Sequence, residues 1–133
     1  ISIFKSILCD RNYVFVGDKF GRGKKQNEYI NILIDSVFTL CPGGNRHFET
    51  FRFYETLEMG SIPLVVNSQK LFDNSSIFQK APIDSFDSWE NAAKFAKYLI
   101  KDKSALEVLQ LNLRDWWKNA KWQFSLQLKQ MNS

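Results

Sequence analysis

One short stretch of the sequence gathers residues that suit a phosphate-bearing ligand. Gly43 and Gly44 follow an apolar run, and charged residues come soon afterwards, among them Arg46, Arg52 and Glu55. Glycines permit a positive φ and a close approach of the backbone to a ligand. An arginine can hold a phosphate through two parallel hydrogen bonds. A pair of glycines is a weak motif, so an ordinary solvated turn between a strand and a helix is the alternative.

The helix expected after these glycines strengthens the phosphate interpretation. We predict it over residues 49–59, with Gly60 as its C-terminal stop. Free N–H groups near Thr50 and the helix dipole favour an anion at its start. Arg52 and Glu55 are three residues apart and share one helix face. Arg52 would neutralise a diphosphate while Glu55 accepts hydrogen bonds from both ribose hydroxyls. The alternative is a surface ion pair of small effect.

Other residues that could carry chemistry are few. His47 is the only histidine, and one histidine without cysteines or carboxylates around it is a poor metal site. The aspartates lack the D-x-D spacing that would pair carboxylates around Mn²⁺ or Mg²⁺. We therefore expect no metal. Arg22, Lys24 and Lys25 form a basic loop that either contacts a phosphate or is simply solvated.

Predicted strands and helices alternate along the chain. Apolar and β-branched runs predict strands at residues 13–16, 36–40, 61–66 and 81–86. Helical spacing of apolar residues predicts helices at residues 27–35, 49–59, 89–101 and 104–131, the last as one long helix or two in series. The alternation predicts an α/β fold, a Rossmann-like parallel sheet with helices on both faces. Ligands bind such sheets at the carboxyl ends of the strands.

Several local features refine these elements. Ser88 is typical of an N-cap for the helix at 89–101, which Asp102 or Lys103 should end. Pro63 belongs near the start of its strand or on a sheet edge. The last helix carries an apolar face that predicts core or interdomain packing rather than a membrane or single-stranded nucleic acid: Leu109, Leu113, Trp116 and Trp117. Trp122, beside Lys118 and Lys121, raises the same alternatives.

Composition limits the class of protein. The 133 residues, 44% hydrophobic and 24% charged, suit one globular domain and argue against disorder or a disulfide scaffold. No apolar run is long enough to span a membrane. The net charge of +4 favours an anionic ligand but is too small to indicate nucleic acid.

Cys9 and Cys41 are expected to be buried free thiols, although pairing cannot be read from sequence. Because the chain starts without Met, we expect it to be part of a longer protein.

The run from Phe38 to Val66 resembles the nucleotide-sugar motif of the exostosin family of glycosyltransferases. In that family a strand is followed by a Pro–Gly-type loop. After the loop come, in order, a small residue, Phe or another apolar residue, arginine, any two residues, glutamate and alanine. A strand reading Ile or Val, Pro, Val follows. This chain supplies CPGG at 41–44, TFRFYET at 50–56 and GSIPLV at 60–65. Thr56 stands where the family usually has alanine.

The resemblance implies the C-terminal, donor-binding half of a GT-B enzyme, which has two Rossmann-like domains with a cleft between them. Such an enzyme transfers a sugar from a UDP-sugar to a glycan hydroxyl with inversion and needs no bound metal. The catalytic base would come from an N-terminal domain of the same protein, outside this chain. The resemblance assigns donor contacts to Gly43, Gly44, Arg46, Thr50, Arg52 and Glu55.

Two alternatives stay open at the level of sequence. The chain could belong to another GT-B family with a different donor or stereochemistry, or it could be a non-catalytic nucleotide-binding module. The sequence does not identify the sugar or the acceptor. The resemblance implies the Golgi lumen, with a membrane anchor upstream, for a eukaryotic protein and the cytoplasm otherwise.

Overall fold

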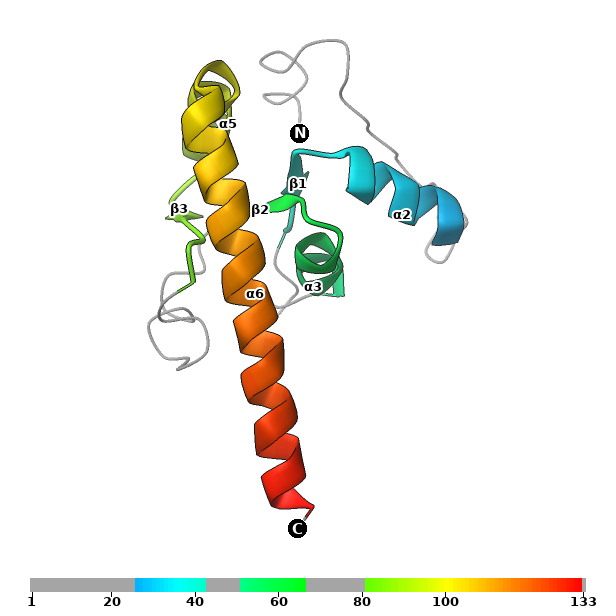
Figure 1. Ribbon diagram of the computed structural model, residues 1–133. Helices are drawn as coiled ribbons and strands as arrows, with labels where there is room; N and C mark the ends of the chain where they lie inside the picture. Colours follow the sequence, from blue (N-terminus) through cyan, green and yellow to red (C-terminus); the bar gives the residue numbers. More distant parts are fainter. Residues whose placement is uncertain (1–25, 43–50, 67–80, 133) are drawn as a thin grey trace.

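The computed structural model describes residues 26–42, 51–66 and 81–132. As the sequence predicts, α2, β1, α3 and β2 alternate along the chain, and a further strand and two helices follow (Figure 1). The elements are α2 (Gln26–Asp35), β1 (Phe38–Leu40), α3 (Phe51–Glu58), β2 (Ile62–Val66), β3 (Ser85–Phe86), α5 (Trp89–Lys101) and α6 (Lys103–Met131). The strand predicted at residues 13–16 lies outside the described residues.

The three described strands form one sheet in the order β1-β2-β3, and both pairings are parallel. Phe38 of β1 lies opposite Ile62 of β2, and Val65 of β2 lies opposite Ser85 of β3. This confirms the parallel pairing predicted for residues 36–40 and 61–66. A parallel sheet with intervening helices is the α/β arrangement of a Rossmann-like domain.

The strands are shorter than predicted. β1 begins at Phe38 because Ser36 completes the end of α2, where its N–H donates to the carbonyl of Leu33 at 3.2 Å. β3 contains only Ser85–Phe86 of the predicted strand at 81–86. The helices therefore hold most of the regular structure in the described part of the chain.

Pro63 is the second residue of β2, the central strand of the described sheet, so only the expectation that it lies near the strand start is confirmed. The N–H of Ile62 donates to Val37, and the carbonyl of Leu64 accepts from Cys41. Successive N–H groups of a strand alternate in direction, so the nitrogen of Pro63 faces the side on which β3 pairs only from Val65 onwards. Proline costs no sheet hydrogen bond at this position.

Side chains from both faces of β2 build the core. On one face, Leu64 packs with three alanines of α5. These four residues form the α5 cluster: Leu64, Ala92, Ala93 and Ala96. Val65 packs on the other face in the α3–α6 cluster, with Cys41, Phe53, Leu57, Ile62 and Leu113. Neighbouring strand residues point to opposite faces, so helices cover both sides of the sheet. This confirms the predicted layering for the described elements.

The helix predicted at residues 89–101 matches α5 at both ends. Ser88 is its N-cap and accepts a hydrogen bond from the N–H of Asn91 at 3.2 Å. Asp102 ends the helix and also caps α6, because its side chain accepts from the N–H of Ala105 at 3.1 Å. One residue thus joins the two C-terminal helices.

The C-terminal segment forms one continuous helix, α6, instead of two in series. Its predicted apolar face packs on the α3–α6 cluster, which confirms core packing for Leu109, Leu113, Trp116 and Trp117. Trp122 is 61% exposed, and the C-terminal part of α6 runs on beyond the other described elements (Figure 1). No described helix combines the length and the apolar character needed to cross a membrane.

Candidate functional site

Helix α3 divides into a buried face and an exposed face. Phe53, Thr56 and Leu57 are buried against the sheet and α6. The hydroxyl of Thr56 donates to the carbonyl of Arg52 at 2.6 Å, which satisfies this polar group inside the core. Arg52 and Glu55 lie on the exposed face. The core therefore fixes the backbone from which both candidate donor residues project.

Cys41, directly after β1, is buried and free, as the sequence predicts. Burial raises the pKa of its thiol to about 11, although the Thr56 hydroxyl and the positive charge of Arg52 act in the opposite direction. The sulfur lies 3.6 Å from Oγ1 of Thr56. A thiol with so high a pKa stays protonated at neutral pH, which agrees with the packing role that its burial in the core gives Cys41. Cys9 lies outside the described residues.

A tyrosine from α2 joins the exposed face of α3. The hydroxyl of Tyr29 donates to Oε2 of Glu55 at 2.9 Å. Partial burial and this hydrogen bond to Glu55 raise the pKa of Tyr29, while the nearby positive charge of Arg52 acts in the opposite direction. The phenol thus binds Glu55, lies close to Arg52 and stays protonated at neutral pH.

Arg52 and Glu55 do not pair with each other. The ion pair found within the described part of the chain joins Lys121 and Glu58 instead. No ion pair between Arg52 and Glu55, the alternative interpretation, is found among the described residues. The Tyr29 hydroxyl binds Glu55 and lies near Arg52, so a cationic and an anionic group share one exposed face.

Most of the predicted site residues lie in segments that the structure does not describe. Gly43, Gly44, Arg46 and Thr50, with His47 between them and the basic loop at residues 22–25, fall outside the described residues. Arg52 and Glu55 are described and lie together. Sequence reasoning missed Tyr29, which it counted only as an apolar position of the helix at 27–35. The available signal was its hydroxyl, which an amphipathic pattern ignores.

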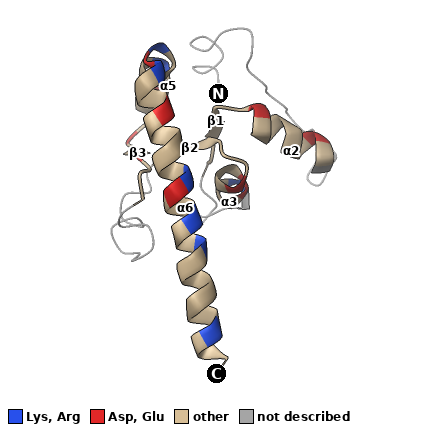
Figure 2. Cartoon of the chain, in the orientation of Figure 1, with Lys and Arg blue, Asp and Glu red and all other residues tan. Residues whose placement is uncertain are grey.

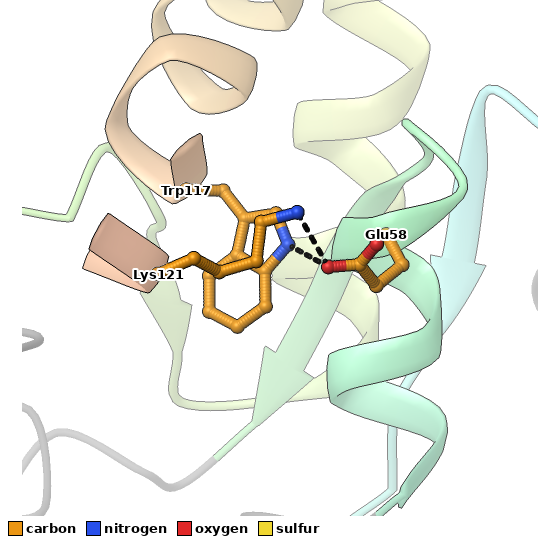
Figure 3. Close-up of polar contacts among 3 residues, drawn as sticks. All are labelled: Glu58, Trp117 and Lys121. Atoms are coloured by element: carbon orange, nitrogen blue, oxygen red, sulfur yellow. Dashed lines mark hydrogen bonds and ion pairs between the residues drawn. The ribbon is translucent and has the colours of Figure 1, made fainter. Parts of the chain in front are cut away.

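A second polar cluster lies at the C-terminal end of α3. Trp117 Nε1 donates to Oε1 of Glu58 at 2.9 Å, and Lys121 Nζ lies 2.8 Å from the same oxygen (Figure 3). Lys121 also lies 5.7 Å from the centre of the Trp117 ring. The hydrogen bond from Lys121 holds the pKa of Glu58 below its ordinary value, with a further contribution from Trp117 and opposition from burial. This cluster ties α6 to α3 and is structural.

Basic residues recur along α6 in the cartoon coloured by charge (Figure 2). Lys121 is engaged by Glu58, and Trp117 is partly buried. These contacts agree with packing and do not favour a nucleic-acid surface. Among the described residues, no group of three or more histidines, cysteines or carboxylates could hold a metal ion.

A comparison with known protein families shows to which family this chain belongs. The RXYLT1 C-terminal domain family matches residues 21–127. This chain belongs to that family. RXYLT1 is an exostosin-like xylosyltransferase, so the chain is a glycosyltransferase-related domain of the kind that the motif at 41–65 suggested. No curated protein and no solved structure gave a significant match.

The family match spans the candidate site. It includes Tyr29 of α2, Arg52 and Glu55 of α3, and residues 43–50, where the other predicted donor contacts lie. The strand predicted at residues 13–16 precedes the match. The RXYLT1-type domain therefore contains the whole sequence motif that carries the resemblance to exostosin glycosyltransferases.

Proposed function

We propose that this chain is the donor-binding domain of an inverting GT-B glycosyltransferase, which transfers a sugar from a UDP-sugar to a glycan hydroxyl. One observation carries the proposal. Arg52 and Glu55 lie side by side on the exposed face of α3 without pairing with each other. An unpaired guanidinium suits a diphosphate, and an adjacent carboxylate suits the vicinal hydroxyls of a ribose.

The proposed chemistry assigns each group a separate task. The guanidinium of Arg52, with the start of α3, offsets the negative charge that develops on the leaving diphosphate. Glu55 holds the ribose and so fixes the nucleotide. Inversion needs a base that deprotonates the acceptor hydroxyl, and we assign that base to an N-terminal domain of the same protein. The description of RXYLT1 as a xylosyltransferase makes UDP-xylose the first donor to examine.

The proposal is tested by donor affinity, measured by calorimetry on the full-length protein. Glu55→Gln keeps the shape of the side chain but removes its charge, and loss of a charged hydrogen bond should weaken UDP binding by about 1.5–3 kcal/mol. Arg52→Lys keeps the charge but loses the planar fork, so it should weaken binding as well. Both variants should melt close to the wild-type temperature, because neither side chain belongs to the core.

Glu58→Gln is the matched control. It makes the same change one turn further along α3, at a carboxylate held by Lys121 and Trp117. We expect it to lower the melting temperature and leave UDP affinity unchanged. Stabilisation of the wild type by UDP but not by ADP or NAD would support a uridine donor. Unchanged UDP affinity in both Glu55→Gln and Arg52→Lys would overturn the proposal.

A further inference from the structure

Tyr29 contacts the proposed donor site from a different helix. It comes from α2, and its hydroxyl donates to Oε2 of Glu55 on α3 at 2.9 Å. The positive charge of Arg52 lies close enough to lower the pKa of the phenol. Among the described residues, the second carboxylate oxygen of Glu55, Oε1, accepts no hydrogen bond, and it is the one free to meet a ligand.

We propose that Tyr29 is a positioning residue of the donor site, whose hydroxyl holds one oxygen of Glu55 so that the other faces the ribose hydroxyls of the nucleotide. This inference rests on the proposed function and goes beyond it, because it assigns a role to a residue outside the family motif at 41–65. Tyr29 touches the carboxylate and not the reacting atoms, so its role is to orient the group that binds.

The spacing of Arg52 and Glu55 explains why such a residue is useful. Oppositely charged side chains three residues apart on a helix are close enough to pair. Pairing would occupy the guanidinium and the carboxylate that the donor needs. By donating to Glu55, the Tyr29 hydroxyl orients the carboxylate and occupies one of its two oxygens, and the positive charge of Arg52 lies nearby. A preorganised site binds more tightly, because less side-chain freedom is lost on binding.

A purely structural role is the competing explanation, in which Tyr29 only fastens α2 to α3. Two measurements separate the explanations. A double-mutant cycle with Glu55→Gln shows whether the hydroxyl acts through the carboxylate. Binding of 2′-deoxy-UDP, which lacks one ribose hydroxyl, shows whether the effect of the Tyr29 hydroxyl depends on both hydroxyls of the ribose. Loosening of α2 would weaken the binding of UDP and 2′-deoxy-UDP alike.

The experiment is calorimetry of the full-length protein with UDP and with 2′-deoxy-UDP. Tyr29→Phe removes only the hydroxyl, and loss of one hydrogen bond should weaken UDP binding about 3- to 10-fold. In the Glu55→Gln background the same change should have an effect below about 2-fold, and with 2′-deoxy-UDP the loss should shrink likewise. Tyr98→Phe is the matched control, because Tyr98 is 62% exposed on α5, and it should bind UDP like the wild type.

The outcomes separate this inference from the proposed function. If Glu55→Gln weakens UDP binding and Tyr29→Phe does not, the inference is wrong and the proposed function stands. If Tyr29→Phe weakens UDP and 2′-deoxy-UDP equally, or equally with and without Glu55, Tyr29 has only a structural role. If the wild type does not bind UDP, the proposed function fails, and the inference fails with it.

Discussion

Glu55 and Glu58 lie about one turn apart on α3, and their surroundings give the same side chain two different roles. Glu58 accepts hydrogen bonds from Trp117 and Lys121 through one oxygen, and both partners come from α6. Glu55 meets only the hydroxyl of Tyr29 among the described residues. A carboxylate paired with a cation and an indole links two helices, whereas a carboxylate held by one neutral hydroxyl keeps its charge available to a ligand.

The pairing of Glu58 predicts a loss of stability in acid. Its pKa is lowered in the folded protein, so its contribution is complete above the unfolded-state pKa and is lost as the pH falls through the folded-state pKa. Glu58→Gln should therefore flatten the fall in melting temperature between about pH 5 and pH 3. At neutral pH the substitution should cost less than about 1 kcal/mol, because both partners are partly exposed.

The measurement is the melting temperature across this pH range, by circular dichroism. Glu107→Gln, a change at an exposed glutamate of α6, provides the control and should keep the pH profile of the wild type. A Glu58→Gln profile parallel to that of the wild type would show that the contacts with Lys121 and Trp117 contribute nothing to folding.

At the same scale, the sequence predicted that Arg52 and Glu55 share one face of a helix. It did not predict that Tyr29, on another helix, binds Glu55. The three-residue spacing places Arg52 and Glu55 on one face, and the structure keeps them there. Tyr29 could not be found in this way, because helical spacing describes neighbours on one helix and gives no information on which helices meet. The alternative of an ion pair between Arg52 and Glu55 likewise considered one helix only and left out the hydroxyl of Tyr29.

At the scale of elements, the turn between α3 and β2 sets where the candidate residues lie relative to the sheet. Gly60 has a φ of +79°, a conformation that side chains with a Cβ rarely adopt. Its N–H donates to the carbonyl of Leu57, and the N–H of Ser61 donates to that of Thr56. These bonds close the C-terminal end of α3 and direct the chain at once into β2. The C-terminal stop that the sequence predicted at Gly60 is confirmed.

Gly60→Ala should destabilise the protein through backbone strain alone. Apart from the chain neighbours of Gly60, no heavy atom of the described residues lies within 4 Å of the added Cβ. The expected cost is therefore the roughly 1–2 kcal/mol of a left-handed residue with a side chain. Gly60→Asn should cost less, because asparagine tolerates this conformation. The check is the free energy of unfolding from urea titration. A Gly60→Ala protein as stable as the wild type would show that the turn can relax to a negative φ.

The elements were predictable where the signal is local. Ser88 and Asp102 fix both ends of α5 through hydrogen bonds to backbone N–H groups a few residues away, and such caps can be read from sequence. The strands were predicted too long, because pairing with another strand determines their length. The β-branched and apolar residues after Ser36 predicted that it belongs to a strand. Its N–H instead donates a hydrogen bond to a carbonyl of α2.

At the scale of the whole molecule, the core holds α3 from one side only. The α3–α6 cluster buries Phe53 and Leu57, while Arg52 and Glu55 remain exposed. Group transfer needs a site that excludes water, since water would otherwise compete with the acceptor for the sugar. An exposed donor face suits a domain that binds the nucleotide and relies on a second domain to close over it. This reasoning agrees with the GT-B arrangement that we propose.

The 133-residue chain by itself should therefore bind UDP but transfer no sugar. The donor contacts proposed for Arg52 and Glu55 are present, whereas the base that activates the acceptor is assigned to another domain. Incubation with UDP-xylose and a glycan acceptor, followed by mass spectrometry, should show no glycosylated product. Slow release of free sugar would be compatible, because water reaches an open site, and it should decrease in Glu55→Gln. Sugar transfer to the acceptor by this chain alone would contradict the two-domain proposal and would place the base among its own residues.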